Sequence, residues 1–397
     1  MTTMADNKDK KVLNVPHLRF PEFSGEWEKC KLGDIATGFD YGMNAAAKPF
    51  DGENKYIRIT DIDEASSTYI DKDIVSPDGT LTENYLVNDR DILLARTGAS
   101  TGKSYLYRKS DGKLYYAGFL IRANVTKHNP YFVFSQLHTH RYWSWVSIMS
   151  ARSGQPGINS QEYSSFPVYV TSLREEEKIS ALLSLIDERI ATQNKIIEDL
   201  KLLKSAITDR LYSEVRGTAY TYRQLFDVIN ERNKDNIYHN VLSASQELGM
   251  IDRSDINIDI KFEQASIVSY KIVRKGDYVV HLRSFQGGFA FSEKTGICSP
   301  AYTILRPKDN LMYGYLSHYF TSKQFVKSLN LVTYGIRDGR SINVDEWLDM
   351  KVVIPEKQKQ LHILTTINSI EFKLRNEQKI YTRLIKQKSY LLRQMFI

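Results

Sequence analysis

The sequence predicts a mixed α/β fold in which one arrangement of elements occurs twice along the chain. The second half repeats part of the first at an offset of 184 residues, and each half ends in a long segment without glycine or proline. We therefore expect globular regions at 1–173 and 213–355, followed by long helices at 174–212 and 356–397. Because two apolar seams satisfy each other, we expect an antiparallel coiled coil with a globular region at each end and a pseudo-two-fold repeat.

The repeat is clearest where each globular region meets its helix. The segment "GINSQEYSSFPVYVTSLREEEKISALLSLIDERI" from Gly157 aligns without gaps with "RSINVDEWLDMKVVIPEKQKQLHILTTINSIEFKL" from Arg340, so that Ile158-Asn159 matches Ile342-Asn343. The offset persists to the end of the sequence, which places Tyr212 opposite Phe396. Upstream, "LVNDRDILLARTGASTGK" from Leu86 aligns more loosely with "IVRKGDYVVHLRSFQGGF" from Ile272. Further upstream, residues 32–35 resemble residues 225–228.

Both long segments carry the alternating four- and three-residue spacing of a coiled coil. The seam positions, 184 residues apart in the two copies, are Ile179, Leu183, Ile186, Ile190, Gln193, Ile197, Leu200, Lys204, Ile207 and Leu211, and then Ile363, Ile367, Ile370, Leu374, Glu377, Tyr381, Leu384, Lys388, Leu391 and Met395. Polar residues occupy matching places in both seams. They either specify the register of the pair or are tolerated there, and the sequence favours neither reading.

Strands and helices are predicted within each globular region. Short aliphatic and aromatic runs predict strands, and two longer amphipathic segments predict helices. The predicted strands are 55–63, 91–96, 115–125 and 166–170 in the first region, and 267–273, 277–283 and 300–307 in the second. The predicted helices are 131–149 and 312–329.

Composition narrows the functional class. The formal charge of +7 permits a nucleic-acid partner, but the excess lies mainly in the last helix. Seven basic residues stand against one acidic residue between Arg96 and Lys127, interleaved with Tyr105, Tyr107, Tyr115, Tyr116 and Phe119. We expect basic turns beside exposed aromatic groups there, or else a solvated sheet face. No apolar run suggests a membrane span or a signal peptide, and two distant cysteines are typical of a reducing, cytoplasmic compartment.

The turn "ARTGASTGK" after the strand "DILL" first suggests a phosphate-binding loop. That loop needs four residues between its glycines and a helix after it, whereas Gly98 and Gly102 enclose three residues and a strand-like pattern follows. Other enzymatic motifs fail similarly: "NPYF" at 129–132 lacks the second proline of adenine methyltransferases. We therefore expect a non-catalytic chain without a cofactor or metal.

Three segments together resemble a known family. The opening "PHLRFPEFSGEWEKCKLGDI", the turn "ARTGASTGK" after "DILL", and "LREEEKISALLSLIDERI" are similar to the DNA-specificity subunit of type I restriction-modification enzymes. The resemblance implies two target-recognition domains, each reading half of a split asymmetric site in double-stranded DNA. It also implies two methyltransferase subunits, which carry S-adenosylmethionine, and two ATP-driven restriction subunits. The alternative is a coiled-coil protein-interaction scaffold without DNA specificity.

The predicted DNA contacts lie on two loops in each globular region, the first of them directly after an aliphatic strand. The predicted residues are Arg96, Thr97, Ser100, Thr101, Lys103, Gln155 and Asn159 in the first region and Arg283, Ser284, Gln286, Arg337, Arg340 and Asn343 in the second. The second region lacks the Gly-Lys of the first turn. Equivalence of the two turns at residue level is therefore not expected.

Overall fold

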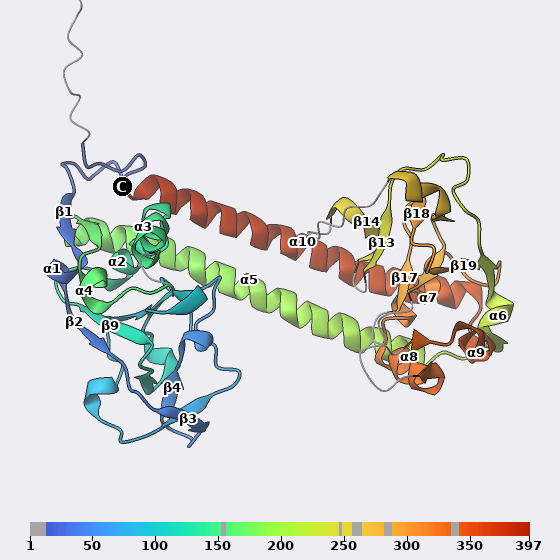
Figure 1. Cartoon of the computed structure of the whole chain (residues 1–397), viewed down its shortest axis with the longest axis horizontal. Coiled ribbons are helices and arrows are strands. Elements are labelled where there is room, and N and C mark those ends of the chain that lie inside the picture. Colours follow the sequence, from blue (N-terminus) through green and yellow to red (C-terminus); the bar gives the residue numbers. More distant parts are fainter. Residues whose placement is uncertain (1–12, 152–155, 246–247, 256–263, 282–287, 335–340) are drawn as a thin grey trace, which may run out of the picture. The chain divides into compact units, whose positions relative to one another are not determined.

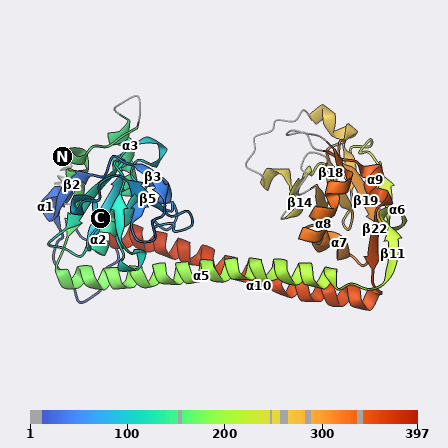
Figure 2. The ribbon, with the colours of Figure 1, turned by 90° about the horizontal axis from the view of Figure 1, so that it is seen from below.

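The computed structural model describes residues 13–151, 156–245, 248–255, 264–281, 288–334 and 341–397 (Figure 1). Contacts within the chain define two compact units. The first comprises 1–195 with 379–397, and the second comprises 196–378. Helices α5 (Leu173–Ser213) and α10 (Lys357–Met395) contribute to both units and are unbroken (Figure 2). The two predicted long helices are thereby confirmed.

The first unit is built on an antiparallel sheet in the order β2-β9-β6-β7. Its central strand β6 is buried on both faces, which explains the uninterrupted run "DILLA". Ile92 and Leu94 pack with helices, whereas Leu93 and Ala95 pack with small strands. The elements are β1 (Glu28–Lys31), α1 (Leu32–Ile35), β2 (Ala36–Tyr41), β3 (Ala46–Pro49), β4 (Lys55–Ile57), β5 (Val75–Asp78), β6 (Asp91–Ala95), β7 (Ser104–Leu106), β8 (Leu114–Tyr116), β9 (Leu120–Val125), α2 (Pro130–Gln136), α3 (His140–Ser150), α4 (Ser160–Ser164) and β10 (Pro167–Val170).

The second unit repeats this design with the sheet order β12-β19-β16-β17. Strand β16 takes the place of β6, and Asp277 takes the place of Asp91 at its start. The elements are β11 (Thr218–Thr221), α6 (Tyr222–Leu225), β12 (Phe226–Ile229), β13 (Leu242–Ser245), β14 (Gly249–Asp252), β15 (Lys271–Val273), β16 (Tyr278–Val280), β17 (Phe289–Phe291), β18 (Gly296–Cys298), β19 (Thr303–Pro307), α7 (Tyr315–Tyr319), α8 (Lys323–Ser328), β20 (Thr333–Tyr334), β21 (Ser341–Ile342), α9 (Val344–Asp349) and β22 (Lys351–Ile354).

Several predicted element bounds were wrong. The helix predicted at 131–149 is two helices, because Thr139 caps α3 through its side chain, and Ser322 similarly divides 312–329. The strand predicted at 115–125 is interrupted by a turn, and only 55–57 of 55–63 are extended. Only 271–273 of the strand predicted at 267–273 are extended. Helix α1 corresponds to α6, so the predicted match of residues 32–35 was displaced by three residues.

The long helices pack antiparallel within each unit. In the first unit, Ile179 and Leu183 of α5 share an apolar cluster with Met395 of α10. The Lys388 ammonium lies 2.6 Å from the Asp187 carboxylate there. In the second unit, the Lys204 ammonium lies 2.5 Å from the Glu371 carboxylate. Asp187 and Glu371 are 184 residues apart, as are the two lysines, so the same ion pair is built twice.

The predicted repeat also places Tyr212 and Phe396 in equivalent surroundings. The Phe396 ring lies 5.2 Å from the Phe132 ring, between centroids, in the first unit. In the second unit the Tyr212 ring lies 5.5 Å from the Tyr315 ring. Aromatic contacts thus anchor the end of α5 to the second unit and the end of α10 to the first.

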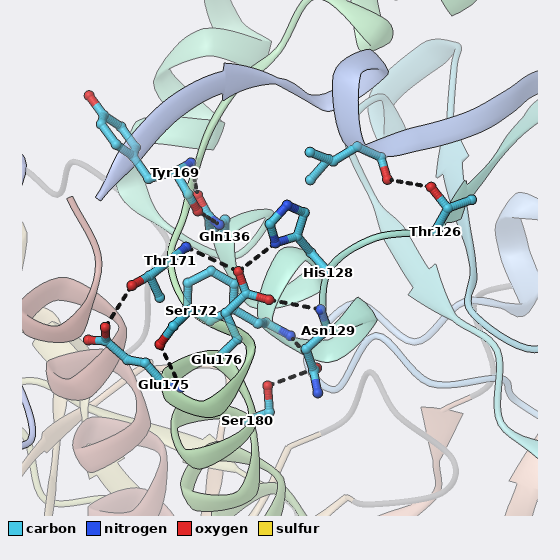
Figure 3. Close-up of polar contacts among 12 residues, drawn as sticks. Thr126, His128, Asn129, Gln136, Tyr169, Thr171, Ser172, Glu175, Glu176 and Ser180 are labelled. Carbon is cyan, nitrogen blue, oxygen red and sulfur yellow. Dashed lines mark hydrogen bonds and ion pairs between the residues drawn. The ribbon is translucent and has the colours of Figure 1, made fainter. Parts of the chain in front are cut away.

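Buried carboxylates fix the start of α5 to the first unit (Figure 3). Glu176 is completely buried and accepts hydrogen bonds from the backbone nitrogens of Asn129 and Thr171, while its other contact is with His128 Nδ1 at 2.8 Å. Glu175 beside it accepts two bonds of 2.7 Å from Arg19. The equivalent of Glu176 in the second unit is Gln360, which is also buried and bonds to backbone atoms before α7 and α10.

Candidate nucleic-acid interface

The turn after β6 is a tightly closed loop over residues 96–103. Residues 98–100 form a short 3-10 helix, and Gly102 N donates a 3.0 Å hydrogen bond to Ala95 O. Gly102 has a φ of +94°, and a Cβ there would come within 2.8 Å of the Val146 side chain. Glycine is required at this position because the loop returns directly against α3. Strand β7 follows the loop, as its alternating pattern predicted, where a phosphate-binding loop would continue into a helix.

The structure brings the two predicted loops of the first unit together. Thr97 forms an antiparallel bridge with Gly157, and Ile158 N donates a 2.9 Å hydrogen bond to Arg96 O. Asn159 follows immediately and caps α4, accepting a 2.9 Å bond from Glu162 N. Gln155 lies outside the described residues. Residues about 60 positions apart in sequence therefore form one surface at the end of the central sheet.

Arg96 is positioned by an aromatic neighbour that the sequence did not suggest. Its guanidinium lies 4.6 Å from the centre of the Tyr41 ring at the end of β2. The Tyr41 hydroxyl accepts a 3.3 Å hydrogen bond from Ser160 N. Hydrogen bonding with the Ser160 side chain, then this backbone bond and the Arg96 charge, lowers the pKa of the Tyr41 phenol, although burial acts in the opposite direction. A stacked guanidinium keeps its edge available for two parallel hydrogen bonds, which is the geometry that guanine presents.

The remaining predicted residues of the turn differ in their exposure. Thr101 is buried, and its hydroxyl donates a 2.8 Å bond to Gly98 O, so its side chain closes the turn. Ser100 and Thr97 are half-buried. The Lys103 ammonium lies 3.4 Å from the Glu64 carboxylate, whose side chain is 86% exposed. Such an exposed ion pair is weak, which leaves Lys103 free to exchange it for a phosphate.

The expected band of exposed aromatic residues was wrong. Tyr105, Tyr115 and Tyr116 are buried in the core, Tyr107 is half-buried, and Phe119 alone of the five is exposed. Several basic residues of the run also have acidic partners, as Lys113 does in Glu53. The sequence pattern failed here because β8 is covered on both faces, with Tyr116 in one apolar cluster and Tyr115 in another.

In the second unit, most of the residues predicted to contact DNA lie outside the part of the chain that the structure describes. Arg283, Ser284, Gln286, Arg337 and Arg340 lie outside the described residues. Asn343 is described and caps α9, accepting a 3.3 Å hydrogen bond from Glu346 N. Asn159 and Asn343 are equivalent in the repeat, and both begin a short helix. The side-chain oxygens of both residues accept these capping bonds. Their contacts with DNA stay predictions.

In the part of the chain that the structure describes, no group of histidine, cysteine, aspartate or glutamate is arranged to hold a metal ion. Within the same residues, no helix has the length and apolar character needed to cross a membrane. Both cysteines are free, and burial raises the pKa of Cys298 to about 12, far from that of a reactive thiol.

Two features of the interface escaped the sequence prediction. Tyr41 comes from a strand far away in sequence and carries no motif. The exposure of Phe119 could not be told from the sequence, because the tyrosines named with it are buried or half-buried. A pairing of Tyr41 with Arg96 follows only from the sheet order, which places β2 beside β9 and β9 beside β6.

Comparison with known proteins shows what the chain resembles. Residues 24–202 match a family model, the type I restriction modification DNA specificity domain. The predicted resemblance to type I specificity subunits is thereby confirmed. The matched segment contains the turn at 96–103, residues 156–160 and the first part of α5. The predicted DNA-contacting residues of the first unit therefore lie within the matched segment.

One curated relative and two solved structures extend the comparison. The relative is a type I restriction enzyme specificity subunit from Methanocaldococcus jannaschii, 24% identical over 208 residues. That match covers 52% of this chain, and the chain spans 46% of the relative's length.

The first solved structure is the S subunit of a type I restriction-modification system from M. genitalium. It has a TM-score of 0.59 and 14% identity, covering 96% of this chain and 99% of that one. The second comes from a study of assembly and conformational transition in the type I R-M system. Its TM-score is 0.56 at 14% identity, covering 93% and 97%. Both show that the fold, including the second unit, is shared.

Proposed function

We propose that this chain is the DNA-specificity subunit of a type I restriction-modification complex. Each globular unit reads one half of a split, asymmetric site in double-stranded DNA. The observation that carries the proposal is the meeting of the 96–103 turn with residues 156–160 at the end of the sheet, inside a matched specificity domain. The repeated sheet order supports a second reading surface on the second unit.

The two units differ where they would read DNA and agree where they would meet protein. The long helices keep a gapless offset and repeat the same ion pair, whereas the turns after β6 and β16 differ in sequence. This is expected if identical partners bind the helices and two different half-sites bind the globular units. An asymmetric bipartite target follows.

Exposed apolar side chains on α5 support protein partners. Leu185 is 58% exposed in the first unit, and Leu202 and Leu203 are 70% and 48% exposed in the second. A single exposed apolar residue is ordinary on a surface, whereas several along one helix suit contact with a protein partner. We infer that two methyltransferase subunits cover them, and that two restriction subunits join the complex through those subunits.

The proposal is tested by selection from a library of random duplexes. The chain is co-purified with its methyltransferase subunit, and bound duplexes are sequenced after several rounds. We expect enrichment of two fixed half-sites separated by a constant, unspecified gap. A pure interaction scaffold would enrich no motif, and that result would reject DNA specificity.

The assembly is tested separately by the variant Leu202→Ser with Leu203→Ser. These residues are exposed, so the variant is expected to fold normally while losing affinity for the methyltransferase subunit. Replacing Lys201, an exposed neighbour, by Ser serves as the control. Unchanged assembly of the double variant would show that this face of α5 is not a docking surface.

A further inference from the structure

Phe119 projects from the turn that joins β8 to β9. Its ring is 62% exposed, although phenylalanine is usually buried. A single exposed apolar residue is ordinary on a protein surface, so exposure alone has no functional meaning. Two further observations distinguish Phe119: the backbone of its turn is held by hydrogen bonds, and the turn is bonded to Arg96.

The turn is held rigidly by backbone hydrogen bonds. Ala117 N donates to Ile57 O at 3.0 Å, and Gly118 N donates to Met43 O at 2.9 Å. Leu120 N closes the turn by donating to Ala117 O at 2.8 Å. A Cβ at Gly42 would come within 2.3 Å of Ala117 O, so the chain packs against the turn at van der Waals contact. The backbone of the turn is therefore fixed, so binding through Phe119 costs little backbone entropy.

The turn is joined directly to the predicted DNA-contacting loop. Phe119 O accepts a 3.1 Å hydrogen bond from Arg96 N, and the Arg96 guanidinium is stacked on Tyr41. The surrounding segment, 96–127, carries seven basic residues and one acidic residue. An apolar ring on a turn that is hydrogen-bonded to Arg96, in a segment whose basic residues outnumber its acidic residue, suits a duplex better than an apolar protein partner.

The equivalent turn of the second unit carries a different residue at this position. Strand pairing places Ala123 opposite Ile92 in the first unit and Leu305 opposite Tyr278 in the second. Because β6 and β16 are equivalent, the residue that corresponds to Phe119 is Ala301. At this turn position the two units therefore differ, with phenylalanine in the first and alanine in the second.

We propose that Phe119 is a wedge that enters a base step of the first half-site and partly unstacks it. The inference rests on the proposed function, because it requires this unit to bind duplex DNA. Apolar side chains inserted between base pairs kink the duplex and favour steps that unstack easily. Arg96 would read base edges while Phe119 selects for deformability at the adjoining step.

The test uses the full chain assembled with its methyltransferase subunit and the site found by selection. Duplexes carry 2-aminopurine, whose fluorescence rises on unstacking, at successive positions of the first half-site. We expect the wild-type complex to raise the fluorescence at one step. Phe119→Ala should abolish that rise and weaken binding by roughly tenfold or more, whereas Phe119→Leu, which keeps apolar volume, should retain most of both.

Controls separate the possible failures. Phe50→Ala removes another exposed phenylalanine of the same unit and should change neither signal. Failure of the wild-type complex to select any motif would reject the proposed function and the wedge with it. Normal selection with no fluorescence rise, or a Phe119→Ala variant that behaves as wild type, would reject the wedge alone. If replacing thymine by uracil reproduced the loss without any fluorescence rise, Phe119 would contact a thymine methyl group and the wedge would likewise be rejected.

Discussion

At the scale of single residues, Arg96 and Lys103 are expected to have different roles on DNA. Arg96 is held by Tyr41 for contact with a base edge, so Arg96→Ala should cost about 1–3 kcal/mol of binding free energy and relax one position of the site. Lys103 is placed for a phosphate, so Lys103→Ala should weaken all sequences alike and reduce the salt slope by about one. Fluorescence anisotropy over a salt series measures both effects.

Lys113→Ala is the matched control for these two variants. Lys113 belongs to the same basic run but pairs with Glu53, and neither residue is part of the predicted interface. Its replacement should leave affinity and salt slope unchanged. Wild-type behaviour of both Arg96→Ala and Lys103→Ala would remove the turn from the interface.

A second residue-scale prediction concerns pH and His138. Burial, and then the charge of Lys388, lowers the pKa of His138 to about 4, although Asp187 and a hydrogen bond to Phe134 O act in the opposite direction. Above pH 6.5 both the folded and unfolded states are neutral at this residue. As the pH falls below 6.5, His138 binds a proton in the unfolded state but stays neutral in the folded state until about pH 4, so the free energy of unfolding decreases.

Urea unfolding at several pH values measures this effect. Between pH 7.5 and 5, His138 should contribute a loss of about 2 kcal/mol. His138→Gln should remove that part of the pH dependence, whatever its effect on overall stability. An identical pH slope in the variant and the wild type would show that His138 is not the titrating group.

At the scale of elements, the repeated ion pair is expected to fix the register of the long helices. Asp187 and Lys388 are about one-fifth exposed, and Tyr131 also donates a hydrogen bond to Asp187. A double-mutant cycle with Asp187→Asn and Lys388→Gln should give a coupling energy of about 1 kcal/mol or more by urea unfolding. The equivalent cycle at Glu371 and Lys204 should give a similar value.

The exposed pair of Lys201 and Glu198 provides the comparison. Both side chains are more than half exposed, so their coupling should not exceed about 0.5 kcal/mol. If the two repeated pairs also couple this weakly, the apolar seam alone sets the register. The polar residues are then merely tolerated, which is the other reading that the sequence left open.

Elements governed by local periodicity were predictable, and those governed by distant contacts were not. The apolar residues of the α5 and α10 seams recur four and three positions apart, so both helices could be predicted from the sequence. The division of 131–149 depends on one cap at Thr139, which a continuous apolar pattern conceals. The stacking of Arg96 on Tyr41 and the union of two loops depend on sheet order, for which the sequence carries no local signal.

At the scale of the whole molecule, the central claim is that two different globular units read two half-sites at a spacing set by the long helices. Both α5 and α10 lack glycine and proline, so neither contains a residue that would bend it. Deleting Gln193–Asp199 together with Glu377–Arg383 removes one heptad from each helix. Each repeated ion pair lies on one side of the deletion, so its register is kept.

The most direct test is to measure the affinity of this deletion variant, assembled with its methyltransferase subunit, for half-sites at every spacing. Each helix is shortened by about 10 Å, and DNA rises about 3.4 Å per base pair, so the preferred gap should contract by up to about three base pairs. The accompanying rotation of roughly 20° per heptad does not match the turn of three base pairs, so a smaller contraction with weaker binding also agrees with the claim. An unchanged preferred gap would contradict it, and the long helices would then serve partner docking alone.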